Sequence, residues 1–395
     1  MTSAKQHFCE LGDLLDATDF LREIRHHLHR HPELSLQEAG TAAMVAEHLT
    51  QWGYEVTRNV GGHGVVGTLR AGDGARSVAV RADMDALPIT EESGQPHASE
   101  VKGVMHACGH DGHTTMLLGA ARQLARSRNF SGTVHLVFQP AEEGEAGALR
   151  MIEDGLFERF PCDAIFGMHN QPGVAAGTLL FGVGPFMSAS DRVVITIRGR
   201  GGHAARPQLT VDPVLIAGSL IMALQSVVAR NIDPTAIAIV TIGTVHAGVA
   251  TNVIPESAEL GLSIRSFDAA VRARLRERIT ALVSAHVAGY GGTVEIDYEL
   301  GYPVLVNSPP ETEFARQVAE ELVGPAQVVF PYGPVTGSED FAYYLERRPG
   351  CFLRLGNGIE SPMVHNASYD FNDANLTVGA AYWTRLVERF LAQPL

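Results

Sequence analysis

At 395 residues the chain is longer than a typical single domain, so its length favours two domains. Apolar residues make up 45% of the chain and charged residues 19%, a balance that argues against a disordered protein. The formal charge of −14, from 30 Lys and Arg against 44 Asp and Glu, argues against nucleic-acid binding, because that function needs clustered basic residues.

The first part of the chain alternates between helical and strand patterns. Amphipathic or alanine-rich stretches predict helices, and short apolar runs predict strands. The helices are expected over 16–29, 38–52 and 114–127, and the strands over 65–69, 77–81, 133–138 and 164–168. This order favours an α/β domain with a mostly parallel sheet and helices on both of its faces.

The pattern changes in the middle of the chain. Strands are expected over 191–198, 236–245, 257–265 and 293–298, with helices over 211–230 and 268–286. This βαββαβ order is that of a ferredoxin-like α+β unit. Beyond it, a helix over 311–322, a strand over 351–355 and a helix over 376–391 resume the first pattern. We therefore expect a catalytic domain over 1–187 and 303–395, with 188–302 inserted as a lid or dimerisation domain.

The cysteines and the N-terminus indicate a cytoplasmic protein. The four cysteines form no C-x-x-C pair and no dense framework, which is typical of a reducing compartment. The first ten residues lack the apolar core of a secretory signal, and no later segment is expected to span a membrane.

The densest group of potential metal ligands lies over 105–113. Three histidines, Cys108 and Asp111 fall within these nine residues. Thiolate and imidazole are the ligands that zinc prefers, and imidazole also suits nickel and manganese. The stretch therefore predicts a metal site, although a solvated histidine-rich loop is the simpler alternative.

Further polar residues follow other apolar runs. Glu142 and Glu143 come after the strand expected over 133–138, His169 ends the run over 164–168, and His365 follows the run over 351–355. In an open α/β sheet, ligands bind outside the carboxyl ends of the strands, so these residues are expected to converge.

The converging residues offer more ligands than one tetrahedral metal ion can use. We expect five of them to bind metal: Cys108, His110, Glu143, His169 and His365. Two ions, bridged by a sulfur or a carboxylate, are the economical interpretation. Glu142 is then free to act as general base, because successive side chains on extended backbone diverge. Two solvated glutamates remain the alternative for this pair.

Four segments of the chain closely resemble the dinuclear metallo-amidohydrolases. They are RADMDALP (81–88), HACGHDGH (106–113), QPAEEG (139–144) and GRGGHAARP (199–207). That family includes hippurate hydrolases, bacterial aminoacylases and plant hydrolases of indoleacetyl-amino-acid conjugates. The resemblance runs from about residue 29 to His365, and no motif position departs from it.

The resemblance implies a role for several residues. Cys108 would be the bridging thiolate, with His110, Glu143, His169 and His365 completing the two metal sites and Glu142 as catalytic base. Asp83 would be the carboxylate that orients a metal ligand from behind. His203 would reach the active site of a neighbouring subunit and stabilise the oxyanion, which implies a homodimer or higher oligomer. Asn252 and Arg265 would contact substrate, Arg265 through a bidentate grip on its α-carboxylate.

The function expected from these features is metal-dependent hydrolysis of the amide bond in N-acyl amino acids, with two ions of Mn, Zn, Ni or Co per chain. A dipeptidase or carboxypeptidase is the nearer alternative, and a non-catalytic metal-dependent binding protein is the more distant one. Glu142 argues against the latter, since a binding site needs no spare base. Ser338, Glu339 and Asp340 also match a family segment, without an assigned role. Neither nucleic acid nor membrane is an expected partner.

Overall fold

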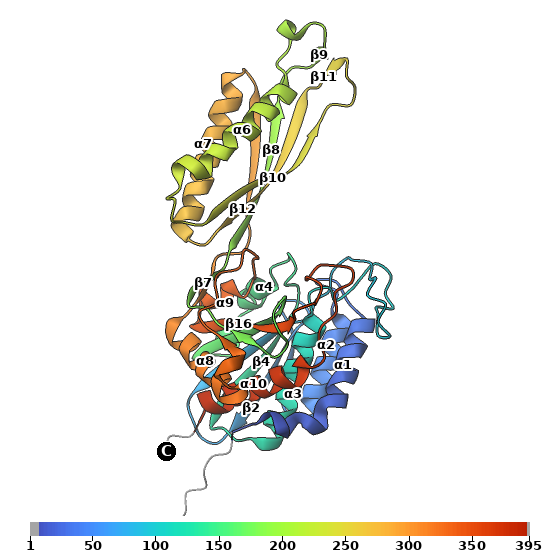
Figure 1. The fold of residues 1–395 in the computed structure, drawn as a ribbon, viewed down its shortest axis with the longest axis vertical. Coiled ribbons are helices and arrows are strands. Elements are labelled where there is room, and N and C mark those ends of the chain that lie inside the picture. The colour runs from blue at the N-terminus through green and yellow to red at the C-terminus, as the bar shows by residue number, and fades with distance from the viewer. Residues whose placement is uncertain (1–7, 393–395) are drawn as a thin grey trace, which may run out of the picture. The chain divides into compact units, whose positions relative to one another are not determined.

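The computed structural model describes residues 8–392, and the chain divides into two compact units (Figure 1). Unit 1 comprises Met1–Gly184, Asn307–Gly333 and Tyr343–Leu395, and unit 2 comprises Pro185–Val306 and Pro334–Ala342. The segment Pro334–Ala342, which the sequence analysis places in the catalytic domain, thus belongs to unit 2. Residues 1–7, which contribute to the expectation that no secretory signal is present, lie outside the described residues.

Unit 1 is built on an eight-stranded mixed sheet. The strand order is β1-β2-β4-β3-β5-β16-β6-β15. The four central strands, β4, β3, β5 and β16, are parallel to their neighbours within this group, whereas β1 and β2 form an antiparallel edge. The strands are β1 (Glu55–Val60), β2 (Gly64–Ala71), β3 (Ser77–Asp83), β4 (Gly132–Gln139), β5 (Ala164–Pro172), β6 (Leu179–Leu180), β15 (Val328–Val329) and β16 (Gly350–Gly358). The predicted α/β class with a mostly parallel sheet is confirmed.

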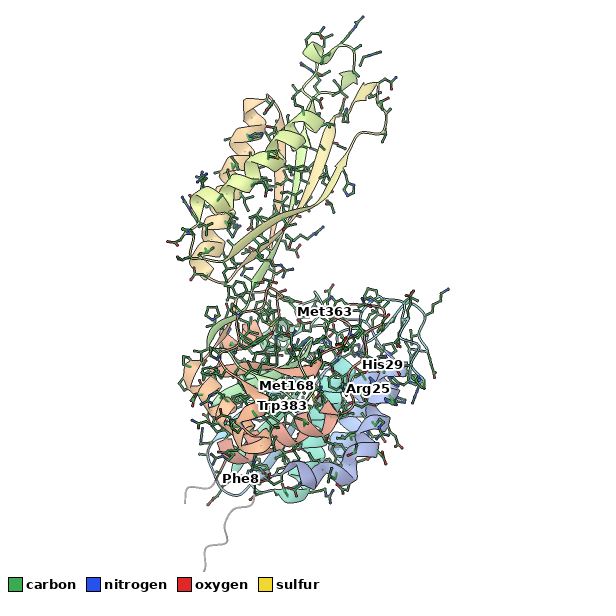
Figure 2. The ribbon with its side chains drawn as sticks, viewed as in Figure 1. Phe8, Arg25, His29, Met168, Met363 and Trp383 are labelled. Carbon is green, nitrogen blue, oxygen red and sulfur yellow. The ribbon has the colours of Figure 1, made fainter. Side chains whose placement is uncertain are left out.

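Long helices enclose the core of unit 1, most of them packed directly on this sheet and the first packed on two other helices. They are α1 (Thr18–Arg30), α2 (Ala39–Gln51), α3 (His110–Ser127), α8 (Pro309–Val323) and α10 (Asn375–Phe390). Short helices are η1 (Leu11–Ala17), α4 (Gly147–Glu153), α5 (Leu156–Arg159), η3 (Pro325–Gln327) and α9 (Ala342–Leu345). Trp383 of α10 and Met168 of β5 lie in the interior (Figure 2).

Two glycines allow α3 and α10 to pack closely. A Cβ atom on Gly119 would lie 2.7 Å from Cβ of Ala380, and one on Gly379 would lie 2.0 Å from Sδ of Met116. Either distance is too short for van der Waals contact, so larger residues would push the helices apart. This packing fixes α3, whose first residue is the predicted ligand His110.

Unit 2 has the predicted ferredoxin-like topology. Its βαββαβ elements are β8 (Ala189–Arg198), α6 (Pro213–Asn231), β10 (Ala238–Ala247), β12 (Ser257–Ser266), α7 (Ala269–Gly289) and β13 (Thr293–Leu300). The sheet order is β10-β12-β8-β13, with every pair antiparallel. Shorter elements are β7 (Gly184–Met187), β9 (Gly202–His203), η2 (Pro207–Leu209), β11 (Val253–Ile254) and β14 (Leu305–Asn307).

Helix α6 differs from one expectation. An 18-residue window of this helix has a mean hydropathy of 1.6, so by length and composition alone it could cross a membrane. The sequence analysis expected no membrane-spanning segment, and α6 is the one helix among the described residues that meets this criterion. In the structure Ile216, Leu220 and Leu224 of α6 are buried in the core of unit 2, while much of the helix is exposed. Its apolar composition thus serves a helix packed on a sheet.

Candidate metal centre

The loop before α3 holds Cys108, and the first turn of α3 holds His110. Gly109 between them has φ +86°, a left-handed conformation in which side chains other than glycine are strained. A Cβ atom there would also lie 2.5 Å from both Nδ2 of Asn170 and Oη of Tyr369. Only glycine fits this turn, which brings the thiol and the imidazole to the same place. Helix α3 therefore begins four residues earlier than predicted.

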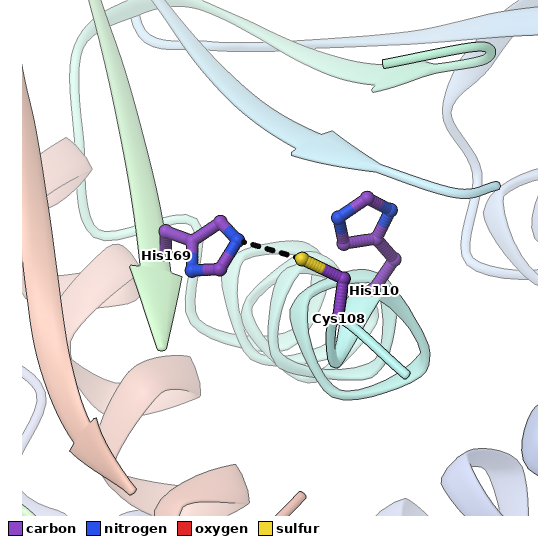
Figure 3. A group of neighbouring side chains, drawn as sticks. All are labelled: Cys108, His110 and His169. Atoms are coloured by element: carbon purple, nitrogen blue, oxygen red, sulfur yellow. Dashed lines mark hydrogen bonds between the residues drawn. The ribbon is translucent and has the colours of Figure 1, made fainter. Parts of the chain in front are cut away.

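Cys108 lies between two imidazole rings (Figure 3). Its Sγ is 3.2 Å from Nε2 of His169, and the rings of His110 and His169 are perpendicular with centroids 6.0 Å apart. Cys108, His110 and His169 form one group whose ligand atoms all lie within 4.8 Å of one another. Cys108, Glu143 and His365 form a second such group. Because the thiol belongs to both groups, it could contribute a ligand atom to each.

Hydrogen bonds orient both imidazoles toward this centre. Nδ1 of His169 donates to the carbonyl of Asn170 at 2.7 Å, and Nδ1 of His110 donates to Oδ1 of Asp85 at 3.2 Å. Each Nε2 is then free to bind a metal ion. Nε2 of His110 is buried and has no hydrogen-bond partner among residues 8–392. Buried nitrogens are normally paired, so this unpaired atom fits a metal ligand.

The charges around the thiol also fit a bound cation. Burial and then the charges of Glu143 and Glu142 raise the pKa of Cys108 well above its ordinary value. Burial alone would lower the pKa of His110, but the charge of Asp83 and the hydrogen bond to Asp85 raise it to about 10. The site thus favours positive charge, and a divalent ion would supply it and deprotonate the thiol.

The two glutamates lie in a loop after β4, beside the other ligands. Oε1 of Glu143 is 3.2 Å from Nε2 of His365, and the ligand atoms of His110, Glu142 and Glu143 lie within 4.8 Å of one another. Glu142 is only 7% exposed. The sequence analysis assumed an extended backbone for this pair, but the chain turns directly before it, because Ala141 has φ +56°. The structure nevertheless brings the five predicted ligands and Glu142 together in unit 1.

The residues predicted to contact substrate or the oxyanion lie in unit 2. His203 is exposed on β9, and its Nδ1 accepts a hydrogen bond from the amide of Ala205 at 3.1 Å. Asn252 is close to it, since its carbonyl accepts from the amide of Ala204 at 3.1 Å. Arg265 is half-buried near the C-terminal end of β12, where its guanidinium donates to Oγ of Ser338 at 3.1 Å. His203 thus lies in the two-stranded β9–β11 sheet, beyond the Ser257 end of β12, whereas Arg265 lies near the opposite end of β12.

Comparison with known proteins identifies the family of the chain. The family model described as Peptidase family M20/M25/M40 matches residues 79–389. The chain belongs to this family. It is 42% identical to the hippurate hydrolase of Campylobacter jejuni, over 96% of this chain and 99% of that protein. It is 37% identical to thermostable carboxypeptidase 2 of Saccharolobus solfataricus, over 96% of this chain and 97% of that protein.

A solved structure of the M20 family is also similar to the chain. It is a Bacillus subtilis protein described as a dinuclear metal-binding peptidase, with 34% sequence identity and a TM-score of 0.83. The match covers 95% of this chain and 99% of that one. This M20 chain is thus a hydrolase of a family with dinuclear metal sites.

Two aspartates near the end of β3 contact different histidines of α3. Asp85 accepts from Nδ1 of His110, whereas Asp83 accepts from Nδ1 of His113 at 2.7 Å and lies 3.8 Å from Nε2 of His110. Asp85, which the sequence analysis did not single out, is thus the carboxylate hydrogen-bonded to the predicted ligand His110, and the role expected for Asp83 stays a prediction. Nε2 of His113 accepts from the amide of Asn170 at 3.0 Å, so both of its ring nitrogens are paired within the protein.

Proposed function

We propose that this M20 enzyme hydrolyses the amide bond of N-acyl amino acids, such as hippurate or N-acetyl amino acids, to a carboxylic acid and a free amino acid. The observation that carries the proposal is the buried carboxylate of Glu142 beside five other side chains suited to bind metal. The relative named hippurate hydrolase is similar over nearly its whole length.

Cys108, His110, Glu143, His169 and His365 would hold two divalent ions, for which Mn, Zn, Ni and Co are candidates. When bound, such ions polarise a carbonyl and make water a better nucleophile near neutral pH. Glu142 would accept the proton of the attacking water and return it to the leaving amine. Asp85 keeps the His110 ring in the orientation that this site needs.

His203 is proposed to stabilise the oxyanion in the active site of a neighbouring subunit. His203 lies beyond the Ser257 end of β12 and Arg265 lies at the other end, eight residues away. At about 3.3 Å per residue, the distance along β12 that separates the two residues is about 26 Å, which is much longer than an N-acyl amino acid. If both residues contact substrate, as proposed together with Asn252, they therefore belong to different chains for any one active site.

The surface of unit 2 supports a homodimer. Val214, Leu215 and Met222 of α6 are between 45% and 72% exposed, which is unusual for large apolar side chains on one helix. Strand β10 is at an edge of the four-stranded sheet, and an unpaired edge can pair with a second chain. We propose that unit 2 mediates this contact.

The enzyme is proposed to act in the cytoplasm. All four cysteines are free and buried, as suits a protein that folds in a reducing compartment.

The function is tested with a substrate panel of hippurate, N-acetyl amino acids and free dipeptides. The metal-free chain would be reloaded with Mn, Zn, Co or Ni, and the Glu142→Gln variant would serve as the control for contaminating activity. We expect turnover of one or more N-acyl amino acids to exceed that of every dipeptide. Faster cleavage of dipeptides would instead favour the carboxypeptidase or dipeptidase alternative, which the similarity to a carboxypeptidase keeps in view.

A further inference from the structure

Two residues in the left-handed backbone conformation, neither of them glycine, are joined through a single carboxylate. Leu36 has φ +64° and Ala141 has φ +56°. This conformation is unfavourable for residues with a Cβ atom, and it persists where the surrounding structure enforces it. Both amides donate to the same atom, Oε1 of Glu38, at 3.0 Å for Leu36 and 2.8 Å for Ala141.

Ala141 sets the course of the loop that holds the two active-site glutamates. It is fully buried and directly precedes Glu142 and Glu143. Its carbonyl accepts from the amide of Gly147 at 2.9 Å, and the amide of Glu143 donates to Oδ2 of Asp85 at 3.0 Å. The loop is thus held at Ala141 by Glu38 and two residues later by Asp85.

The Glu38 side chain does not serve the helix that follows it. Glu38 precedes α2, but its carboxylate caps none of the amides of α2. Glu33 does this instead, because its two carboxylate oxygens accept from the amides of Gly40 at 2.9 Å and Thr41 at 2.8 Å. Besides its own backbone amide, the fully buried Glu38 carboxylate accepts from the amides of the two left-handed residues.

We propose that Glu38 is a positioning residue of the metal centre, which holds Ala141 in its left-handed conformation and so keeps Glu143 and Glu142 at their places. The inference rests on the proposed roles of these two glutamates as metal ligand and general base. Without the acceptor, Ala141 would relax toward negative φ, and the direction of the following side chains would change. A left-handed alanine is disfavoured about tenfold, so relaxation would leave only a minor fraction of chains ready to bind metal.

The test measures metal affinity, so it does not depend on the substrate. Metal-free chains would be titrated with Mn²⁺ alone in competition with a chelating indicator, and thermal unfolding would be recorded in parallel. Glu38→Ala removes the acceptor. Glu38→Gln keeps an oxygen at the same place, and since burial raises the pKa of Glu38 to about 7, the amide resembles the protonated acid. Glu33→Ala is the matched control, because it removes two hydrogen bonds at the same helix without touching the loop.

Of the two Mn²⁺ ions, we expect Glu38→Ala to bind the more weakly bound one with an affinity at least about tenfold lower than wild type. Glu38→Gln should keep its affinity within about threefold of wild type. Glu33→Ala should lower the unfolding temperature while leaving the affinity unchanged. In an Ala141→Gly background, adding Glu38→Ala should weaken binding less than it does alone, because glycine adopts the left-handed conformation readily. If Glu38→Ala alone does not fold, the comparison of Ala141→Gly with the Ala141→Gly/Glu38→Ala double variant still tests the proposal.

Unchanged affinity in Glu38→Ala would overturn the proposal. A loss in Glu38→Gln as large as that in Glu38→Ala would do the same, because the acceptor oxygen would then not be what matters. Absence of hydrolysis of every N-acyl amino acid in the panel would contradict the proposed function and would not alter these affinities.

Discussion

Replacing Asp85 by alanine should weaken metal binding without preventing folding. Asp85 is buried and accepts three hydrogen bonds, from Oγ of Ser35 at 2.6 Å, Nδ1 of His110 at 3.2 Å and the amide of Glu143 at 3.0 Å. Burial alone would raise the pKa of Asp85, but the hydrogen bond and charge of His110, followed by the bonds from Ser35 and Glu143, lower it. Asp85 is thus a carboxylate at neutral pH.

The magnitude follows from the donors that Asp85→Ala leaves behind. Two of the three belong to predicted metal ligands, and a buried donor without a partner costs about 1–3 kcal/mol. If the site relaxes partly around the two unpaired donors, the net loss of metal-binding free energy is about 2–3 kcal/mol. This loss corresponds to roughly 30- to 150-fold weaker binding. This range agrees with the 10- to 100-fold loss that is typical when a partner of a metal ligand is removed, so we expect about 30- to 100-fold.

The assay is Mn²⁺ titration of the metal-free chain, followed by hippurate turnover at saturating metal. Ser35→Ala is the matched control, because it removes one donor to Asp85 and leaves His110 and Glu143 paired. We expect its affinity to stay within about threefold of wild type. If Asp85→Ala binds both ions as tightly as the wild-type chain, the reasoning about hydrogen-bonded ligands is wrong.

Three further predictions concern the base, the dimer and pH. Glu142→Gln should lower turnover by about 10²–10⁴ with metal content retained, whereas Glu143→Gln should lose metal; reversed results in metal analysis would exchange their roles. A purified mixed dimer of His203→Ala and Glu142→Gln should recover about half of wild-type activity, because one of its two sites has both residues intact, and no recovery would place His203 within its own chain. Burial alone would lower the pKa of His29, but Asp111 at 2.8 Å raises it to about 9. The charged His29 therefore stabilises the folded state fully below about pH 6.5, and this stabilisation is lost as the pH rises through about 9. In urea unfolding the wild-type chain should therefore lose up to about 3 kcal/mol more than His29→Gln between pH 6.5 and pH 9.5, and equal losses would refute the assignment.

The charged group around His29 links α1 to the loops near the metal centre. Arg25 and His29 lie next to each other on α1 (Figure 2). Arg25 is fully buried and lies 3.6 Å from Asp111 and 3.0 Å from Asp373. The pH prediction for His29 therefore concerns stability, and the metal-bound state should be tested separately.

Elements with a clear apolar period could be predicted from the sequence, and elements fixed by tertiary contacts could not. The βαββαβ order of unit 2 follows from alternation such as that of Val193, Ile195 and Ile197 in β8, all fully buried. Strand β1 was missed because its mostly exposed residues at a sheet edge carry no such period. The early start of α3 depends on a left-handed Gly109, which the sequence does not reveal.

The candidate site divides in the same way. Motif residues such as Cys108 and His110 could be predicted because cysteine and histidine so closely spaced have few other uses. The choice between Asp83 and Asp85 could not, since both follow the same strand and only the fold decides which faces His110. Glu38 lies about a hundred residues before the loop that it contacts, so no local pattern connects them.

The central claim is that five side chains hold two metal ions that hydrolysis requires. The most direct measurement is a titration of the metal-free chain with Mn²⁺ or Zn²⁺, with bound metal and hippurate turnover recorded on the same sample. We predict about two ions per chain and activity that appears as they bind. Cys108→Ala should lose bound metal and activity, whereas the control Cys162→Ala should keep both the metal and the activity. Full turnover after exhaustive chelation, or wild-type metal content and activity in Cys108→Ala, would contradict it.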